Sequence, residues 1–335
     1  MSSYSNYARY MRRTYGPFAL PFASVKFLGS RIEDLFLFIG SIIRRKNQKD
    51  LRMAQMESFP ILGIPTSAFG SDIIFEKTAV IIHIFYPELT AEIMEYVKNI
   101  PIKYGLFIST NSDEKAVAIK EAIALSGVEA CELEIKVTPN RGRDIAPTFI
   151  GFRDVFNRYP CFIHLHSKRS LSFKGQGDSW RHHLFGNLLG NRDIAESCLR
   201  LLSFQKTGIV YTDHFGPAKK NIGWSENFDL TQAMLKYAGV KISKKTAPEF
   251  PSGSMFWGRS DAVKKILDLH LTYDDFPEEK GQIDGTLAHA IEHAFLLFAE
   301  GAGFSWIKTK PLTDAEIPRP WCFTPLLPAK DGSEN

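Results

Sequence analysis

Short apolar runs alternate with amphipathic stretches through the middle of the chain, from about residue 70 to residue 300. Apolar runs of about four to eight residues are typical of buried strands, and apolar residues roughly three or four positions apart are typical of helices. Strands are expected at 78–86, 104–109, 131–137, 161–166, 207–211 and 253–257, and helices at 89–98, 112–126, 145–158 and 284–300. This order predicts an α/β domain with a mixed, mostly parallel sheet flanked by helices, which binds ligands at the carboxyl ends of its strands.

The loop after the third expected strand carries a first cluster of polar residues, Asn140-Arg141-Gly142-Arg143-Asp144. Gly142 lets the backbone approach a ligand closely, and an arginine beside a helix N-terminus favours a phosphate group. The alternative is an ordinary strand-to-helix connection in which Asp144 only caps the next helix. The loop is therefore a candidate ligand-binding segment.

The fourth expected strand ends in a second cluster, His164-Leu165-His166-Ser167-Lys168. Because side chains alternate along a strand, His164, His166 and Lys168 share one face, where two imidazoles and an ammonium group favour an anion such as a diphosphate. A His-x-His pair also suits a metal ion, but a neighbouring lysine repels a divalent cation. Histidines half-buried at the sheet without a ligand are the remaining alternative.

A third cluster lies between residues 282 and 293, where Asp284 stands at the start of the helix expected over 284–300. The helix dipole favours an ionised carboxylate at that end, and a carboxylate at the mouth of a pocket can act as a general base. The alternative is that Asp284 is only the N-cap of the helix.

Composition and charge narrow the class of protein. The 335 residues are 44% hydrophobic, which excludes a disordered chain, and the composition also excludes a disulfide scaffold. The four cysteines lie far apart without a CxxC pair, so no structural zinc site is implied. The net charge is +4, but residues 1–60 hold ten Lys or Arg residues against four Asp or Glu residues, so the rest of the chain is slightly acidic. A slightly acidic main domain is not typical of a protein that binds nucleic acid.

The first 70 residues form a basic amphipathic extension, and its apolar stretch 25–45 ends in an Arg-Arg-Lys run. An amphipathic helix of this kind can lie in the interface of an anionic membrane, and the alternative is a helix packed on the main domain. No apolar run reaches the roughly 18 residues of a transmembrane helix, and no secretory signal is evident. We expect an extension at 1–70, a main domain at 71–315 and a tail at 316–335, with the protein peripheral at the inner face of the cell membrane.

Six motifs in order resemble the rhamnan synthesis protein F family: HIFYPEL, NRGRDIAP, HLHSKRS, SWRHHLFGNLLG, PSGSMFWGR and DGTLAHAIEH. The resemblance covers about residues 78–307. The order of elements is also similar to that of inverting GT-A glycosyltransferases, which implies a GT-A-like, Rossmann-like fold.

The resemblance implies a glycosyltransferase of bacterial cell-surface polysaccharide synthesis, such as rhamnan or O-antigen synthesis. Its donor would be a nucleotide-diphospho-sugar, with dTDP-L-rhamnose as the leading candidate, and its acceptor a lipid-linked oligosaccharide at the membrane surface. In metal-dependent enzymes of the GT-A pattern an Asp-x-Asp sequence follows the corresponding strand, whereas here His166 and Lys168 occupy those positions. The expectation is that no cofactor is required, with Mg²⁺ or Mn²⁺ as the alternative.

The motifs and the resemblance together assign candidate roles. Asp284 is the candidate catalytic base. The candidate diphosphate-binding residues are His166, Lys168 and Arg143. The candidate residues for the nucleotide and the rest of the donor are His83, Phe85, Tyr86, Asn140, Gly142, Asp144 and His164. The candidate acceptor-side residues are Trp180, Arg181, Ser254 and Trp257, where the two tryptophans can stack on a sugar ring or belong to the core.

Two other classes of function stay open from the sequence. One is a non-catalytic module that binds a nucleotide-sugar or carbohydrate and assists a partner transferase, because the Asp-x-Asp carboxylates are replaced. The other is a metal hydrolase with His164, His166 and either Asp213 or Asp284 as ligands.

Overall fold

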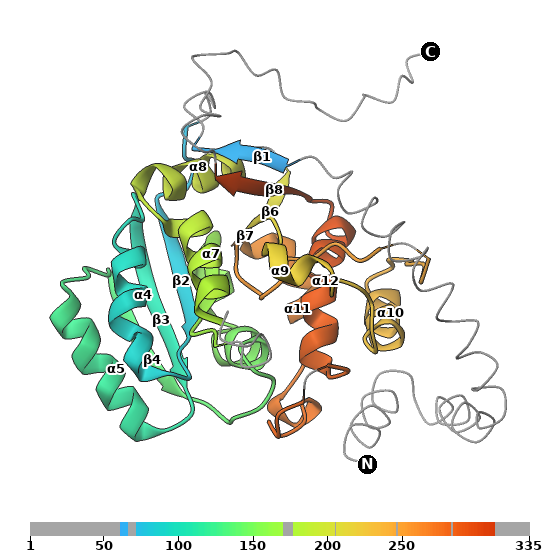
Figure 1. Ribbon diagram of the computed structural model, residues 1–335, viewed down its shortest axis with the longest axis horizontal. Coiled ribbons are helices and arrows are strands. Elements are labelled where there is room, and N and C mark those ends of the chain that lie inside the picture. Colours follow the sequence, from blue (N-terminus) through green and yellow to red (C-terminus); the bar gives the residue numbers. More distant parts are fainter. Residues whose placement is uncertain are drawn as a thin grey trace.

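The computed structural model describes residues 61–65, 72–169, 177–204, 206–245, 247–282 and 284–311. The stretch 25–45, for which a membrane-bound helix was predicted, and the tail 316–335 lie outside these residues. Within them, the predicted α/β architecture is confirmed: helices flank a mixed, mostly parallel sheet of eight strands, consistent with a GT-A-like fold (Figure 1). None of the helices in these ranges is both long and apolar enough to span a membrane.

The strands follow the order β1-β8-β6-β7-β5-β2-β3-β4 across the sheet. They are β1 (Ile61–Ile64), β2 (Lys77–His83), β3 (Lys103–Thr110), β4 (Glu132–Val137), β5 (Cys161–His166), β6 (Thr207–Thr212), β7 (Phe256–Arg259) and β8 (Ser305–Pro311). Neighbouring strands run parallel except at β7, which is antiparallel to both β5 and β6. The residues just before β7 therefore lie at the same edge of the sheet as the carboxyl ends of β5 and β6.

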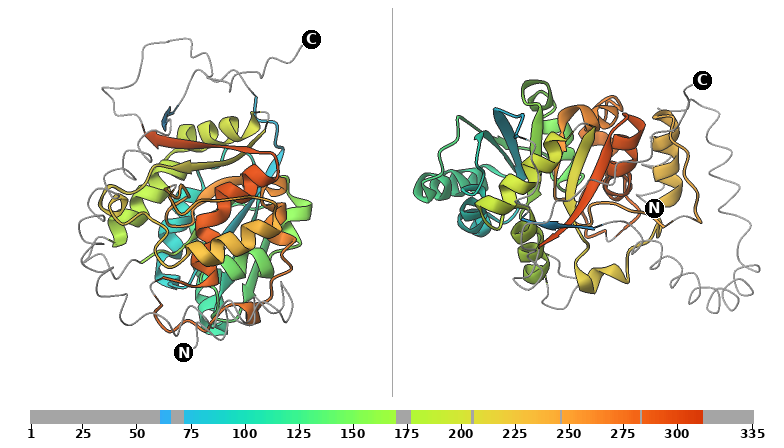
Figure 2. Two further views of the ribbon diagram at one scale, coloured as in Figure 1. Left: turned by 90° about the vertical axis from the view of Figure 1, so that its right-hand side faces the viewer. Right: turned by 90° about the horizontal axis from the view of Figure 1, so that it is seen from above.

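Helices cover both faces of the sheet (Figure 2). One face carries α4 (Thr90–Val97), α5 (Asp113–Ser126), α7 (Gly177–Leu189) and α8 (Arg192–Ser203). The other carries η3 (Pro147–Gly151), α6 (Val155–Arg158), α10 (Phe228–Tyr237), α11 (Lys264–Leu267) and α12 (Leu287–Gly301). The connections also contain the short helices η2 (Pro87–Leu89), α9 (Gly216–Lys219), η5 (Ser260–Val263) and η6 (Tyr273–Asp275).

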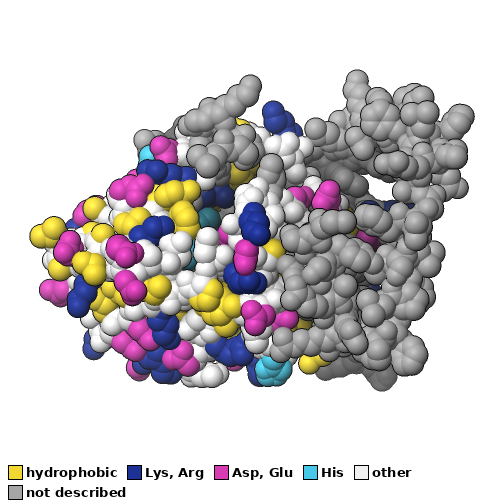
Figure 3. All heavy atoms as spheres, turned by 90° about the horizontal axis from the view of Figure 1, so that it is seen from below, with side chains coloured by type: hydrophobic (Ala, Val, Ile, Leu, Met, Phe, Trp, Pro, Cys, Tyr) yellow, Lys and Arg dark blue, Asp and Glu magenta, His cyan; other side chains and the backbone are white. Residues whose placement is uncertain are grey.

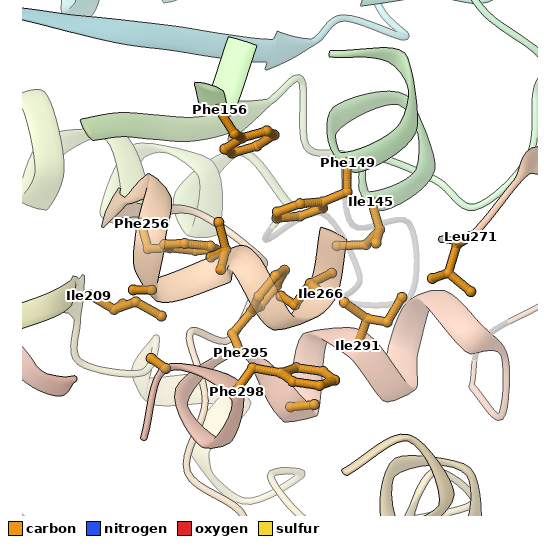
Figure 4. Close-up of a cluster of buried hydrophobic side chains, with 14 of the residues drawn as sticks. Ile145, Phe149, Phe156, Ile209, Phe256, Ile266, Leu271, Ile291, Phe295 and Phe298 are labelled. Carbon is orange, nitrogen blue, oxygen red and sulfur yellow. The ribbon is translucent and has the colours of Figure 1, made fainter. Parts of the chain in front are cut away.

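Successive side chains of the strands pack in two separate hydrophobic cores, one on each face of the sheet. In β2, Val80 and Ile82 join the core beneath α4 and α8, whereas Ala79 and Ile81 join the core beneath α12. Figure 4 shows the second core, in which phenylalanines of η3, β7 and α12 converge. Burial of both faces explains why these strands are almost continuously apolar in sequence.

Several expected boundaries were wrong. The strand expected over 78–86 ends at His83, and the helix expected over 145–158 consists of two short helices, η3 and α6. The helix predicted to begin at Asp284 begins at Leu287, because Thr286 is its N-cap and Gly285 is left-handed with φ 73°. The strand predicted over 253–257 is Phe256–Arg259, because Gly253 and Ser254 both have positive φ. Residues Ile61–Ile64, predicted within the extension, pair with β8 as an edge strand of the sheet.

The direction of the chain across the sheet reverses beside β2. From β2 the chain moves outward to β3 and β4 and then returns to place β5 on the other side of β2. His83 and His166 are register partners at the ends of these two strands. Such a reversal opens a crevice at the carboxyl ends of the strands, where open α/β sheets bind their ligands.

Candidate functional site

A cavity with an empty volume of about 300 Å³, open solvent included, lies at this edge of the sheet. Figure 3 views the molecule from this side and shows a hollow with histidine and basic side chains deep inside it. The loop after β4, the end of β5, the turn before β7 and the first turns of α12 line the cavity with Arg143, Asp144, Ile145, His166, Lys168, Gly253, Ser254, Ala288, His289 and Glu292.

Lys168 supplies the basic wall of the cavity. Its Nζ atom lies 4.1 Å from the centroid of the Trp180 ring, and it forms no ion pair with any residue that the structure describes. Burial lowers the pKa of the Lys168 ammonium group, and the charges of Glu292 and Asp144 oppose that shift. A half-buried cation without an ion-pair partner favours binding of an anion in the cavity.

Two cavity residues other than glycine have a left-handed backbone. Arg143 has φ 54° and Ser254 has φ 57°. Such a conformation costs about 1–3 kcal/mol at a residue with a side chain and is concentrated at functional sites. Each follows a glycine with positive φ, and at Gly253 a Cβ atom would lie 2.8 Å from Leu184 Cδ1. Strain on two walls of one cavity supports a role in binding.

His166 and Glu292 hold the Gly253 turn from opposite sides. The Nε2–H of His166 donates to the carbonyl oxygen of Gly253 over 2.8 Å, and the Gly253 N–H donates to Glu292 Oε1 over 2.8 Å. Burial, aided by the charge of Lys168, lowers the pKa of His166 to about 3. His166 is therefore neutral at pH 7 and shapes the cavity, whereas the positive charge comes from Lys168.

The other two predicted histidines are enclosed near the cavity without lining it. His164 is fully buried among Phe149, Phe256 and Phe295, with its Nε2 atom 3.5 Å from Asp144 Oδ2. The Nδ1 atom of His83 lies 3.0 Å from Ser109 Oγ. Both rings therefore pack behind the site.

The remaining predicted donor-side residues surround the cavity without lining it. The backbone N–H groups of Phe85 and Tyr86 donate to Ser167 Oγ over 2.8 and 3.1 Å, which ties the end of β2 to the end of β5. Asn140 is exposed and accepts from the Glu279 N–H, and Gly142 is buried against Phe276.

The four predicted acceptor-side residues separate in the structure. Ser254 lines the cavity and Trp180 borders it beneath Lys168. Trp257 is fully buried and its indole N–H donates to Leu188 O, so this ring belongs to the core and does not reach a ligand. Arg181 is buried in a two-bond pair with Glu92, at 3.0 Å for each bond, and donates to the carbonyl oxygen of Lys168. Arg181 therefore positions the backbone of the diphosphate-binding candidate.

Asp284 lies beside the cavity and is not part of its lining. Its Oδ1 atom accepts from Asn227 Nδ2, and the Oδ1 atom of that asparagine accepts from the Gly285 N–H. His289 and Glu292 line the cavity, although neither was predicted as a site residue. Their spacing of three residues on α12, which puts both on one face of a helix, was the available signal.

The residues predicted as metal ligands for the hydrolase alternative do not all lie together in the described structure. Within the described part of the chain, no three His, Cys, Asp or Glu side chains are placed to hold a metal ion together. His164, His166 and either Asp213 or Asp284 therefore do not form the joint site that the hydrolase alternative requires.

The buried histidines predict a pH dependence of stability. Burial lowers the pKa of His164 from 6.5 to about 4, so on acidification the unfolded chain takes up a proton that the folded chain does not. The free energy of unfolding should therefore fall from pH 7 toward pH 4, by about 3 kcal/mol from this group alone. His83, His166 and His289 act in the same direction. Urea unfolding at pH 7, 6 and 5 measures the slope.

The matched variants for this prediction are His164→Phe and His270→Asn. His164→Phe removes one titrating group and should flatten the slope, whereas His270 is exposed and its replacement should leave the slope unchanged. Equal slopes for wild type and His164→Phe would show that His164 does not contribute.

Comparison with known proteins adds two findings. The model of the protein family described as rhamnan synthesis protein F matches residues 64–304. The uncharacterized protein WxcX of Xanthomonas campestris pv. campestris strain B100 is 31% identical over 229 residues, which are 67% of this chain and 31% of WxcX. The same figures hold for WxcX of strain ATCC 33913. The chain thus spans about a third of the length of these relatives.

Proposed function

Because the chain belongs to the rhamnan synthesis protein F family, we propose that its cavity binds a nucleotide-diphospho-sugar and transfers the sugar to an acceptor hydroxyl. The family connects the chain with polysaccharide synthesis. The observation that carries the proposal is Lys168, a cation without an ion-pair partner among the described residues, in a cavity at the reversal point of the sheet. A donor diphosphate is the anion that such a reaction presents at this place.

The transfer requires charge stabilisation at the departing group. The bond between the anomeric carbon and the diphosphate oxygen breaks, the acceptor oxygen forms the new bond to that carbon, and the diphosphate leaves with the bonding electron pair. Lys168 and Arg143 stabilise the negative charge that develops on it. Arg143 lines the cavity from the loop after β4, and its guanidinium group donates to the carbonyl oxygen of Gln282 in the segment before α12.

The acceptor hydroxyl must also lose its proton to a base. Asp284 is the residue predicted from the sequence, but Asn227 binds its Oδ1 atom and it lies outside the cavity lining. Glu292 lines the cavity, and the Gly253 N–H fixes one of its two carboxylate oxygens. We therefore assign the base to Glu292 and keep Asp284 as the second candidate.

The resemblance to the family supports a more specific proposal for the donor, the acceptor and the stereochemistry. The donor is dTDP-L-rhamnose or a related nucleotide-sugar, the acceptor is a lipid-linked oligosaccharide, and the transfer inverts the anomeric centre. Attachment to an anionic membrane through residues 1–60 stays a prediction, because those residues lie outside the described ranges.

A donor panel tests the proposed function. Full-length protein is incubated with dTDP-L-rhamnose, UDP-glucose or GDP-mannose and a lipid-linked oligosaccharide acceptor, and release of nucleoside diphosphate is followed together with the mass of the acceptor. Transfer predicts acceptor-dependent release with one donor and a matching gain of one sugar. If the protein binds a donor but releases no nucleoside diphosphate at any acceptor concentration, it is a non-catalytic binding module instead.

Lys168 in the Asp-x-Asp position predicts that turnover does not need a divalent metal. Because a fixed ammonium group takes the place of metal-binding carboxylates, turnover in excess EDTA should equal turnover in Mg²⁺ or Mn²⁺. The measurement is the initial rate of nucleoside diphosphate release after metal removal. Loss of activity in EDTA that Mn²⁺ restores would contradict the prediction.

A further inference from the structure

The first turn of α12 fixes the position of the proton on His289. Thr286 and His289 form a reciprocal capping box at the start of the helix. The Nδ1 atom of His289 lies 2.7 Å from Thr286 Oγ1 and 3.4 Å from the Thr286 backbone nitrogen, whose N–H it accepts. An imidazole nitrogen that accepts a hydrogen bond carries no proton, so the proton of the neutral ring is on Nε2.

The Nε2–H group of His289 is a buried donor with nothing to donate to. The ring is 6% exposed and lines the cavity, and Nε2 has no hydrogen-bond partner among the described residues. Burial, followed by the charge of Arg143, lowers the pKa of His289 to about 4, so the ring is neutral at pH 7. A buried donor without a partner is destabilising, and an acceptor on a ligand would recover that cost.

The same cavity contains an unsatisfied acceptor. Asp144 is 6% exposed and lines the cavity, and its Oδ2 atom is buried without a hydrogen-bond partner in the described structure. His164 Nε2 lies 3.5 Å from this atom and forms no hydrogen bond with it. Two residues of the cavity lining thus each carry a buried polar atom without a hydrogen-bond partner among the described residues, one a neutral donor and the other a carboxylate oxygen.

This pair distinguishes between the parts of a donor molecule. An ionised phosphate oxygen can accept from His289, but it has no proton to donate to Asp144 and is repelled by that carboxylate. A hydroxyl group both accepts and donates. The pair therefore matches hydroxyl groups and leaves the phosphates to Lys168 and Arg143.

We infer that His289 Nε2 and Asp144 Oδ2 bind a hydroxyl group of the transferred sugar and select the donor by it. The inference rests on the proposed function, because it assigns the sugar end of the same nucleotide-sugar. A donor that lacks this hydroxyl leaves both buried groups unpaired, and sites built on such hydrogen bonds discriminate strongly against the deoxy analogue.

The test compares binding of a nucleotide-sugar with binding of its nucleoside diphosphate. Calorimetry on the full chain uses dTDP and dTDP-L-rhamnose, UDP and UDP-glucose, and GDP and GDP-mannose, and the pair that wild type binds is used for the variants. His289→Phe keeps the ring shape and removes the donor. It should weaken nucleotide-sugar binding about tenfold or more and leave nucleoside diphosphate binding unchanged.

A second variant separates recognition from folding. His289→Gln retains a side-chain N–H and should recover part of the nucleotide-sugar affinity, which a purely structural role of the capping box does not predict. If His289→Phe weakens binding of the nucleotide-sugar and of the nucleoside diphosphate equally, or weakens binding of neither, the assignment is overturned while the proposed function stands. Wild-type protein that binds none of the nucleotide-sugars would overturn the proposed function and the inference with it.

Discussion

Replacing Lys168 by methionine is expected to lower sugar transfer about 10²- to 10³-fold, the range for loss of one positioned donor to a developing anion. Methionine has a similar length and can still pack on Trp180, so the melting temperature should change little. The affinity for nucleoside diphosphate should fall together with turnover, because the ammonium group has no ion-pair partner among the described residues and is available to the ligand. The measurements are steady-state rates and calorimetry.

Two variants control this prediction. Lys168→Arg keeps the positive charge and should retain more activity than Lys168→Met, although the guanidinium group fits the cavity less well. Lys264→Met removes an exposed lysine paired with Asp268, outside the cavity lining, and should leave both rate and affinity unchanged. Near-normal turnover of Lys168→Met would remove Lys168 from the mechanism.

Replacing Glu292 by glutamine is expected to lower turnover about 10²-fold or more, because the amide cannot take a proton at neutral pH. The Gln side-chain oxygen can still accept from the Gly253 N–H, so the turn and the donor affinity should be preserved. Turnover at saturating donor and acceptor, together with the melting temperature, measures this outcome.

Asp284→Asn is the matched comparison for the base. The asparagine side chain keeps an oxygen for the Asn227 amide, and we expect a smaller loss of turnover than for Glu292→Gln. If instead Asp284→Asn abolishes turnover and Glu292→Gln retains it, the base is Asp284, the residue predicted from the sequence.

Local sequence signals predicted those elements whose cause is local. The strand Cys161–His166 was predicted with the limits that the structure shows, because burial on both faces makes it mostly apolar up to the polar segment that follows. The helix Asp113–Ser126 was also predicted closely, because Ser112 caps one end and left-handed Gly127, with φ 72°, ends the other. By contrast, Asp284, Gly285 and Thr286 offer two possible caps in three residues, and only the backbone of Gly285 decides between them.

The candidate site was predicted only where a strand end marked it. Arg143 and Asp144 lie in the loop after β4, His166 is the last residue of β5, and Lys168 lies just beyond it; all four line the cavity. His289 and Glu292 come from a helix more than a hundred residues farther along the chain, and their orientation toward β5 depends on tertiary packing. Trp257 failed as a sugar-stacking candidate for the same reason, because its aromatic ring faces α7 beneath the sheet.

The position of a bound nucleoside diphosphate is the measurement that tests the central claim most directly. A crystal structure of the full chain with dTDP, or with whichever nucleoside diphosphate calorimetry shows to bind, locates the phosphates independently of turnover. The proposal predicts phosphate oxygens at hydrogen-bond distance, about 3 Å, from Lys168 Nζ and from the Arg143 guanidinium group. A diphosphate bound elsewhere, with this cavity empty at a concentration that saturates the protein in solution, would contradict it.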